Sequence, residues 1–399
     1  MCARAGFALE AADVAFQGSS INVLPFFASL ETDLRDVPIN RPDLGAGVSD
    51  IMTLRAKGPG PKFRWIAAGF RNSSAEARDV VIVVPDQGFV SSGIKWPKSP
   101  GGGVVSITTA GGIELDILPA IGKGAYAFTL EPGKTAAIAF EISASGLPAA
   151  ALWHREAFDE QKDYLAFFRG ALLGIAVLLT AAMIALYGFR SRPVFLVAGG
   201  FALSGVGFMV IEAGHLPMVL NALGIEALNF QNARALVEGS MAAMLILLLV
   251  TITELRRIMP VIGNVLGIMG GLALAIPIYG FAEPLIASGI ARGLFAFTAV
   301  AGFLLVFWLW RSGETKAENS LVPWAVILLW TFVAMVAALS EPDKAGLSPL
   351  LLSGLCAVLV ILGFTLAHYA FSQGYLSRHF FREAGRRALE NRLVSLQRQ

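Results

Sequence analysis

Charged residues are scarce in this chain. Of its 399 residues, 31 are Lys or Arg and 29 are Asp or Glu, so that 15% are charged, whereas soluble proteins carry about 25%. Cysteine is scarcer still, because Cys2 and Cys356 are the only two and cannot build a disulfide framework. Cys356 lies in an apolar run, where a thiol packs as a small hydrophobic group. These shortages exclude an ordinary soluble protein and a disulfide-rich secreted domain.

The motifs of common catalytic and metal sites are also missing. The four histidines, His154, His215, His368 and His379, are scattered, and the sequence has no HExxH, no GxSxG and no paired Cys or His spacing. The glycines at 101–103 precede a predicted strand rather than a helix, so they form a loop and not a phosphate cradle. Arginines do not cluster on a soluble segment, which excludes a nucleic-acid partner. We therefore expect no enzyme, no metal and no cofactor.

Long apolar runs fill the C-terminal part. The stretches free of Asp, Glu, Lys and Arg are 170–189, 193–211, 239–253, 258–282, 293–310, 319–340 and 345–377. A helix needs about 17–25 apolar residues to cross a membrane, and the third run reaches this length only if Glu238 lies at the interface. We predict an all-α bundle of seven transmembrane helices within 169–373. The predicted spans are 169–189, 193–213, 234–253, 258–280, 286–310, 320–340 and 347–371.

Lys and Arg in the connecting loops predict the orientation. The second, fourth and sixth loops (214–232, 281–287 and 341–346) contain one cation, Lys344. The odd-numbered loops and the tail are rich in cations by comparison. Those cations are Arg190, Arg192, Arg256, Arg257, Arg311, Lys316, Arg378, Arg382, Arg386, Arg387, Arg392 and Arg398. The tail is therefore predicted to be cytoplasmic and the N-terminal region extracytoplasmic, which requires an odd number of spans.

Residues 16–150 have the short alternating runs of a β domain. The expected strands are 63–70, 79–84, 89–96, 104–110, 113–120, 125–130 and 135–142. Pro-Gly pairs at 100–101 and 132–133 mark tight connections. Strands at this spacing predict an extracytoplasmic all-β sandwich that binds a ligand.

The segments on either side of these domains have their own predictions. Residues 1–15 resemble the end of a signal peptide without its apolar core. Either the true start lies upstream, which we favour, or the first span carries the domain across the membrane. Residues 151–168 are predicted to form a stalk helix between the β domain and the bundle, and residues 374–399 a basic cytoplasmic helix.

Ionisable residues collect at the outer ends of the predicted spans, and these residues are Glu212, His215, Arg234, Glu238 and Arg292. Arg234 and Glu238 are four residues apart and can pair on one helix face. One interpretation is a polar vestibule that contacts ligand or couples the β domain to the bundle, because charges at membrane depth tend to face the protein or water. The other, which the sequence favours, is simple snorkelling at the interface.

Two further groups of side chains are candidates for function. Trp65 and Trp96 could stack on a sugar ring, although packing in the β core is the commoner role for such residues. In the tail, Leu389, Leu393 and Leu396 have helical spacing over barely two heptads. This pattern fits the start of a dimeric signalling helix, in which case a homodimer is expected. It also fits a basic helix lying on anionic lipid, and the two interpretations are compatible.

Several stretches resemble one known family. Residues 63–74 are similar to its opening strand and turn, 125–135 to a later turn, and 152–174 to its lead into the first span. In this order and followed by seven spans, they resemble the bacterial seven-transmembrane receptors with diverse intracellular signalling modules. Residues 368–371, continuing into 386–389, are similar to the junction in an alphaproteobacterial branch whose last span leads into PAS and EAL or GGDEF modules.

This resemblance implies a receptor in the bacterial inner membrane that senses a periplasmic ligand, such as a carbohydrate or small metabolite. It would relay the signal to a cyclic di-GMP-type output module. The sequence to Gln399 contains no such module, so the chain is either a truncated form or signals through a partner. The alternatives are a membrane scaffold for a separate enzyme and a transporter. Mid-membrane positions almost free of charge argue against the transporter.

Overall fold

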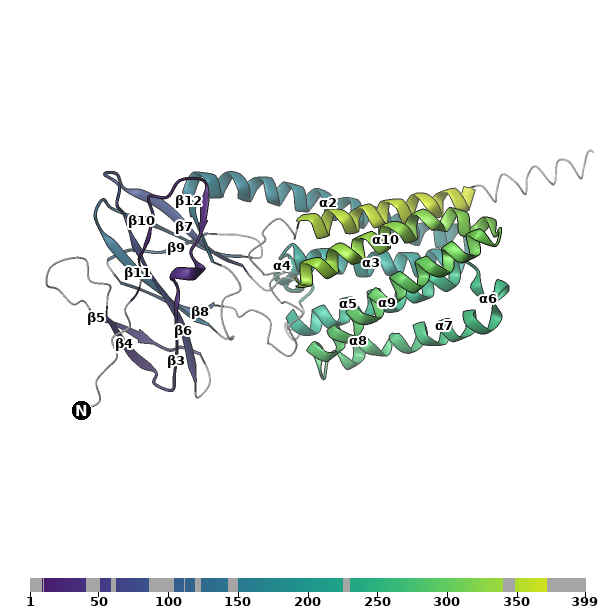
Figure 1. Cartoon of the computed structure of the whole chain (residues 1–399), viewed down its shortest axis with the longest axis horizontal. Helices are drawn as coiled ribbons and strands as arrows, with labels where there is room; N and C mark the ends of the chain where they lie inside the picture. The colour runs from purple at the N-terminus through teal and green to yellow at the C-terminus, as the bar shows by residue number, and fades with distance from the viewer. Residues whose placement is uncertain are drawn as a thin grey trace, which may run out of the picture. The chain divides into compact units, whose positions relative to one another are not determined.

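The computed structural model divides into two compact units (Figure 1). The β unit comprises Met1–Ala171, Met209–Phe230 and Ala334–Leu352, and the helical unit comprises Leu172–Phe208, Gln231–Val333 and Ser353–Gln399. Element labels follow Figure 1. The structure describes residues 9, 11–40, 51–58, 62–85, 104–110, 112–118, 123–142, 150–224, 230–339 and 349–371.

The predicted β-rich region is confirmed. Its strands are β1 (Ala11–Asp13), β2 (Ser20–Asn22), β3 (Ala28–Thr32), β4 (Asp36–Asn40), β5 (Ile51–Arg55), β6 (Phe63–Arg71), β7 (Arg78–Pro85), β8 (Val104–Ala110), β9 (Asp116–Leu118), β10 (Lys123–Leu130), β11 (Thr135–Ile142) and β12 (Ala151–His154). One sheet has the order β1-β6-β11-β8, with β3 also on β6, and the other has the order β2-β12-β7-β10-β9. The strands β4 and β5 form a separate hairpin. The first sheet is mixed, because β1 pairs with β6 in parallel and the other pairs are antiparallel.

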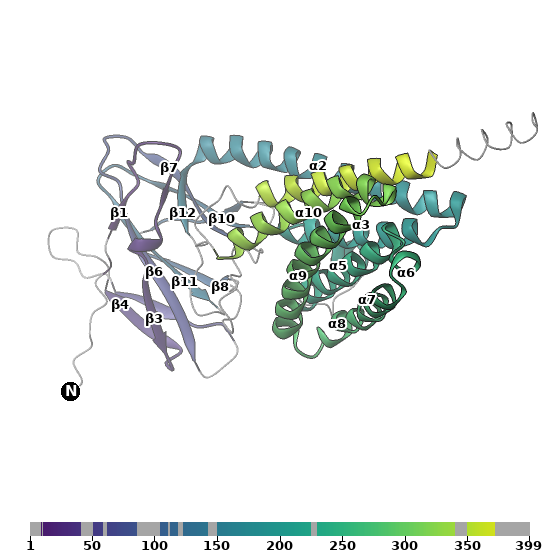
Figure 2. The ribbon, with the colours of Figure 1, turned by 45° about the vertical axis from the view of Figure 1, so that its right-hand side comes forward.

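Two hydrophobic clusters stabilise the β unit. The larger joins the two sheets, with Phe70 and Phe140 from the first and Ile82 and Phe128 from the second. The smaller lies on the β6 and β11 side chains that point the other way, and it includes Trp65 together with residues of the β4–β5 hairpin. Figure 2 shows this hairpin beside β3 and β6. Because both faces of β11 are covered, all of its residues are buried, which explains its nearly continuous apolar sequence.

Two predictions in this region need correction. The strand expected over 113–120 starts only at Asp116, where β9 (Asp116–Leu118) begins. The stalk helix expected from residue 151 begins only at Arg155, because residues 151–154 form β12. The backbone of β12 pairs with β2 on one side and β7 on the other, so its hydrogen bonds belong to the sheet. The strand expected over 89–96 lies outside the described residues.

The described residues include seven helices long and apolar enough to cross a membrane, as the sequence predicts. The helices are α2 (Arg155–Arg190), α3 (Pro193–Glu212), α4 (Leu216–Ala222), α5 (Phe230–Ile252), α6 (Leu255–Ile258), α7 (Pro260–Ala273), α8 (Ala275–Tyr279), α9 (Pro284–Arg311), α10 (Thr315–Leu339) and a last helix, Pro349–Phe371. Proline begins α3, α7 and α9, where its fixed φ and missing N–H suit the first helical position.

The fourth span, predicted over 258–280, is Pro260–Tyr279. It consists of α7 and α8, which are separated at Leu274. Pro277 lies four residues after Ala273, and it has no N–H to donate to the carbonyl oxygen of Ala273. The interruption therefore falls one turn before the proline, near the end of the span rather than at its centre.

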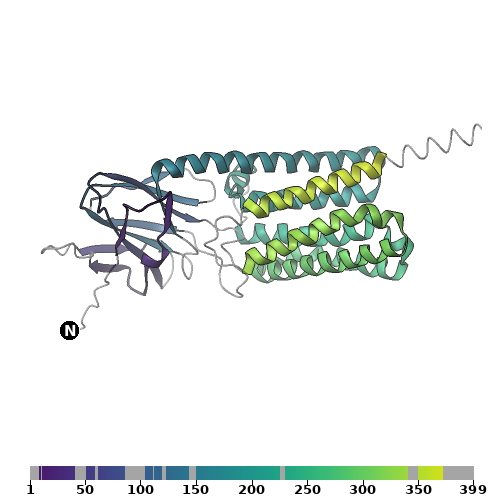
Figure 3. The ribbon, with the colours of Figure 1, turned by 45° about the horizontal axis from the view of Figure 1, so that its top comes forward.

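Aromatic rings connect the helices of the helical unit. Phe201 of α3 stacks with Phe295 of α9 at a centroid distance of 6.5 Å. Trp330 of α10 makes edge contacts with Phe208 at 5.9 Å and with Phe295 at 5.6 Å. The last helix runs beside α2 (Figure 3), where Gly363 lies against the side chain of Leu179. Such close approach by small residues is typical of helix packing in membranes.

Candidate functional site

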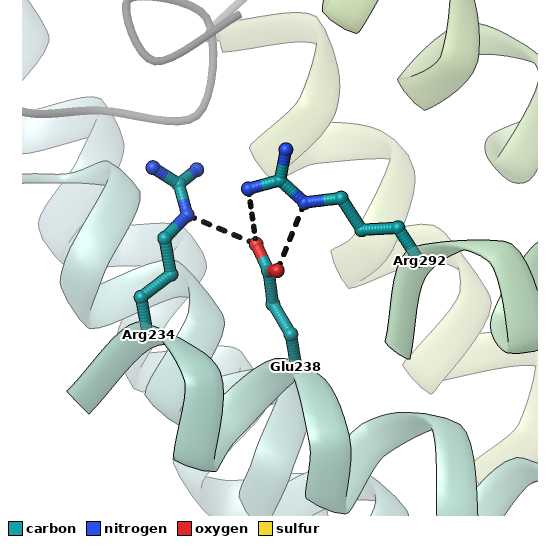
Figure 4. Close-up of polar contacts among 3 residues, drawn as sticks. All are labelled: Arg234, Glu238 and Arg292. Atoms are coloured by element: carbon teal, nitrogen blue, oxygen red, sulfur yellow. Dashed lines mark hydrogen bonds and ion pairs between the residues drawn. The ribbon is translucent and has the colours of Figure 1, made fainter. Parts of the chain in front are cut away.

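Three of the candidate residues, Arg234, Glu238 and Arg292, form one ion cluster (Figure 4). Nε of Arg234 donates a hydrogen bond to Oε1 of Glu238 at 2.9 Å. Arg292 forms a fork, in which Nε donates to Oε2 at 2.9 Å and Nη2 donates to Oε1 at 3.0 Å. Arg234 and Glu238 lie one turn apart on α5, as their spacing predicts, whereas Arg292 lies on α9. The carboxylate of Glu238 therefore ties α5 to α9 through charge-assisted hydrogen bonds.

The cluster is shielded by protein. The side chains of Arg234 and Glu238 are 6% and 7% exposed, and that of Arg292 is 21% exposed. Snorkelling keeps the charged head in water, so this interpretation does not describe Arg234. Buried ions need a well-placed partner to offset the loss of hydration, and each guanidinium here has the same carboxylate as its partner.

Small residues allow α8 to pack closely against α5. Small residues, Ala235 and Gly239, lie next to the charged ones. A Cβ on Gly239 would come within 3.0 Å of the ring of Pro277 in α8, and a Cβ on Gly280 would come equally close to Ala235. The backbone of α8 can approach α5 because these residues have little or no side chain.

The other two ionisable candidates, Glu212 and His215, lie in the β unit with Arg169. Glu212 is 8% exposed and interacts electrostatically with Arg169 of α2. Nη1 of Arg169 also donates to the carbonyl oxygen of Ala213 at 3.4 Å. Burial lowers the pKa of His215, and the positive charge of Arg169 lowers it further. Both effects favour the neutral form of the imidazole.

Arg169 was not among the residues singled out from the sequence. The sequence does contain a signal for Arg169, because this residue is the last cation before the charge-free run at 170–189. A second partnership that sequence reasoning missed is that of Arg292 with Glu238, which are 54 residues apart. Helical spacing reveals pairs three or four residues apart but gives no information about partners on another helix.

The remaining candidates do not join either cluster in the described residues. Trp65 is 1% exposed and packs with Leu54 and Phe63, so its ring faces are covered by protein. Trp96 lies outside the described residues, as do Leu389, Leu393 and Leu396. Across the parts of the chain that are described, His, Cys, Asp and Glu form no group of three or more that could hold a metal ion.

No protein-family model matches this chain, and no curated protein matches it either. The features that bear on function are therefore the two-part architecture and the two clusters of ionisable residues.

Proposed function

We propose that the chain is a transmembrane signalling receptor. In this proposal the two sheets form an open sandwich that binds an extracytoplasmic carbohydrate or small metabolite. The seven helices relay binding to the basic C-terminal helix, and from there to a cyclic di-GMP-type output module in a partner or a continuation of the chain. The cation-rich loops favour a cytoplasmic tail and a periplasmic β unit in a bacterial inner membrane.

The observation that carries this proposal is the junction between β12 and α2. The strand β12 is an interior strand of its sheet, and α2 begins at the very next residue, Arg155. Phe158, in the first turn of α2, packs against Val81 and Ala127 of the same sheet. Because no flexible linker intervenes, a ligand that displaces this sheet would also move the first span.

The ion cluster supports a relay rather than a passive anchor. A scaffold needs only apolar spans, whereas charges such as the buried Arg234 and Glu238 are expensive in a membrane and tend to occur where function requires them. The bonds from Glu238 make α5 and α9 move together. A displacement would then reach several spans instead of being absorbed by one.

The coupling of the β unit to the first span can be tested by making α2 flexible while leaving the β unit intact. The reporter is disulfide crosslinking between Leu393→Cys copies of the full chain in nanodiscs, with Cys2→Ser and Cys356→Ser in the background. The probes are neutral mono- and disaccharides and small dicarboxylates, selected by their effect on thermal stability. The hinge variant is Glu160→Gly/Asp163→Gly, and its matched control is Glu160→Ala/Asp163→Ala, since both positions are exposed.

We expect a stabilising probe to change the crosslinking yield in the parent and in the alanine control, but not in the glycine variant. Glycine disfavours a helix interior by about 1 kcal/mol per residue relative to alanine, so the two variants differ mainly in the stiffness of α2. The receptor proposal is wrong if every stabilising probe leaves the parent's crosslinking unchanged. Arg234→Ala with unchanged expression and response would remove the ion cluster from the relay.

A transporter is the alternative to this proposal. Discontinuous helices broken near the bilayer midplane often form the substrate sites of transporters, whereas α7 and α8 meet at Leu274, near the end of their span. Proteoliposomes loaded with the stabilising probe discriminate between the two functions. If the chain is a receptor, the probe leaves these proteoliposomes no faster than it leaves protein-free liposomes loaded in the same way. If the chain is a transporter, the probe leaves faster, and Pro277→Ala would change that rate.

A further inference from the structure

A polar network holds the end of the last helix, from which the tail continues. Nη1 of Arg192 donates a hydrogen bond to the hydroxyl oxygen of Tyr369 at 2.8 Å. The hydroxyl of Tyr369 in turn donates to Oε1 of Glu254 at 3.1 Å. Arg192 lies in the connection between α2 and α3, and Glu254 lies in the connection between α5 and α6. One hydroxyl group therefore bridges two connections to the last helix.

The chemistry of this bridge requires tyrosine. The hydroxyl accepts a hydrogen bond from a cation and donates one to an anion, and a hydroxyl oxygen can do both at once. The guanidinium of Arg192 also lies 5.5 Å from the centre of the Tyr369 ring. Phenylalanine would retain the ring contact and lose both hydrogen bonds. The hydroxyl can therefore be tested without removing the side chain.

The two connections that bond to Tyr369 each contain a residue with an unusual backbone conformation. In the part of the chain that the structure describes, Ser191 and Glu254 are the two non-glycine residues with positive φ, and φ is 49° at each. Such residues are uncommon and persist where the surroundings hold them in place. Glu254 is itself a member of the network, and Ser191 directly precedes Arg192. Both connections that bond to Tyr369 therefore contain a residue in this conformation.

Solvent reaches this network, in contrast to the cluster around Glu238. Arg192 is exposed and Tyr369 is half-buried. The Glu254 side chain is 29% exposed and also approaches Arg257, which is 82% exposed, at 3.7 Å. Water competes for hydrogen bonds at such positions, so that each contributes modestly and can break and re-form. These are the properties of a reversible contact rather than of a permanent one.

We propose that the hydroxyl of Tyr369 is a latch that holds the last helix against the two connections, and that opening this latch frees the end of this helix to move. The role of the latch in transmitting a signal to the tail rests on the proposed receptor function. The latch itself does not, because it can be measured without any ligand.

The test is a distance measurement in the full chain in nanodiscs. Spin labels are attached at Phe189→Cys on α2 and Phe371→Cys on the last helix, which are 85% and 67% exposed, with the native cysteines replaced by serine. The variants are Tyr369→Phe, Glu254→Ala and the two combined. The matched control is Tyr187→Phe, which removes the same hydroxyl group from the end of α2.

We expect Tyr369→Phe to increase the displaced population of the last helix about tenfold, as the loss of two modest hydrogen bonds implies. Glu254→Ala removes one of the two hydrogen bonds and leaves that from Arg192, so it should have a smaller effect, and the double variant should match Tyr369→Phe because both changes open one latch. Tyr187→Phe should leave the distance distribution unchanged. The latch is refuted if Tyr369→Phe gives the parent distribution, or if Tyr187→Phe gives the same shift.

The two proposals fail in different ways. If the distances do not change but a probe still alters Leu393→Cys crosslinking, the latch is wrong and the receptor stands. If the latch opens as expected but no stabilising probe alters crosslinking, the receptor is wrong and the latch stands. Circular dichroism and gel filtration of each variant establish that the compared proteins are folded. If Tyr369→Phe does not fold, Glu254→Gln, which retains an acceptor, is measured instead. A displaced population between those of the parent and Glu254→Ala supports the latch, and the parent distribution refutes it.

Discussion

The two units satisfy a buried carboxylate in different ways. In the β unit, Glu141 is 2% exposed and accepts hydrogen bonds from the backbone N–H groups of Lys57 at 2.9 Å and Gly58 at 2.8 Å. It also accepts one from the hydroxyl of Ser106 at 2.6 Å. In the helical unit, Glu238 is bound by the guanidinium groups of two arginines. The donors are neutral in the first case and positively charged in the second.

This difference follows from what each environment can offer. A chain end or loop beside a sheet has backbone N–H groups that the sheet does not use, and Glu141 takes two of these. Inside a transmembrane helix the backbone N–H groups already bond along the helix, so a carboxylate must find its donors on side chains. Arginine supplies them, together with the charge that offsets dehydration. The same need leads Glu238 to join two helices, whereas Glu141 fixes one loop.

The largest effect is expected from Glu238→Gln. The substitution leaves Arg234 and Arg292 close together without the charge that both surround, and a broken buried ion pair costs about 3–5 kcal/mol. Thermal unfolding and the yield of folded protein in detergent should both fall sharply. Glu318→Gln, at an exposed position of α10, is the control and should behave like the parent. Equal losses in the two variants would show that burial of Glu238 is unimportant.

A smaller loss is expected from Arg292→Lys, which retains the charge. Arg292 holds both carboxylate oxygens of Glu238 with a planar fork, a geometry that an ammonium group cannot reproduce. We expect a loss of about 1.5–3 kcal/mol, the usual contribution of a hydrogen bond to a charged group. Arg311→Lys, at the exposed end of α9, provides the comparison in the same unfolding assay. If both lysine variants are equally stable, charge alone holds Glu238.

The neutral donors around Glu141 predict a dependence on pH. Burial alone would raise the pKa of Glu141, but hydrogen bonds from Lys57, Ser106 and Gly58 outweigh it and hold the pKa below its usual value. Ionised Glu141 therefore stabilises the fold at pH values above the ordinary carboxyl pKa of about 4.3. This contribution is lost as the pH falls through the lowered pKa of the folded state.

Glu141→Gln should remove this dependence and cost about 1.5 kcal/mol at pH 7, the lower end for one hydrogen bond to a charged group. Hydrogen exchange of residues 135–142 in the full chain, measured between pH 7 and pH 3, follows the stability of this sheet after correction for the intrinsic exchange rate. The parent should lose protection in acid, and Glu141→Gln should lose less. The exposed variant Glu76→Gln should follow the parent. A parent curve parallel to that of Glu141→Gln would mean that Glu141 does not titrate in this range.

The seven spans could be predicted because their signal is contained in each segment. Length and freedom from charge are local properties, and six of the runs show both directly. The strands β6, β7, β10 and β11 were predictable for the same reason. The strands β1 to β5 were not predicted, because they are three to five residues long. The parallel pairing of β1 with β6 joins segments more than 50 residues apart, which no local pattern reveals.

The candidate sites show the same limit. The pairing of Arg234 with Glu238 could be predicted from their spacing, whereas the contributions of Arg292, Arg169 and Tyr369 depend on how helices pack. Glu141 gave only a faint signal, a single carboxylate in an otherwise apolar strand. In each case the sequence indicates that a polar group is in an unusual environment. Its partner becomes evident only when distant segments come together.

The smallest effect is expected at an exposed ion pair, and it tests whether burial is the property that matters. Nε of Arg155 lies 3.0 Å from Oδ2 of Asp159, with side chains 38% and 43% exposed. This distance is similar to the 2.9 Å between Arg234 and Glu238, and both pairs span one helical turn. Exposed pairs contribute about 0.3–0.5 kcal/mol in a helix, so Asp159→Asn should shift unfolding within that range. The two carboxylates would then differ about tenfold in free energy, and burial together with the fork from Arg292 would account for the difference. A loss at Asp159 as large as that at Glu238 would instead show that geometry alone sets the contribution, and the contrast between the two units would lose its physical basis.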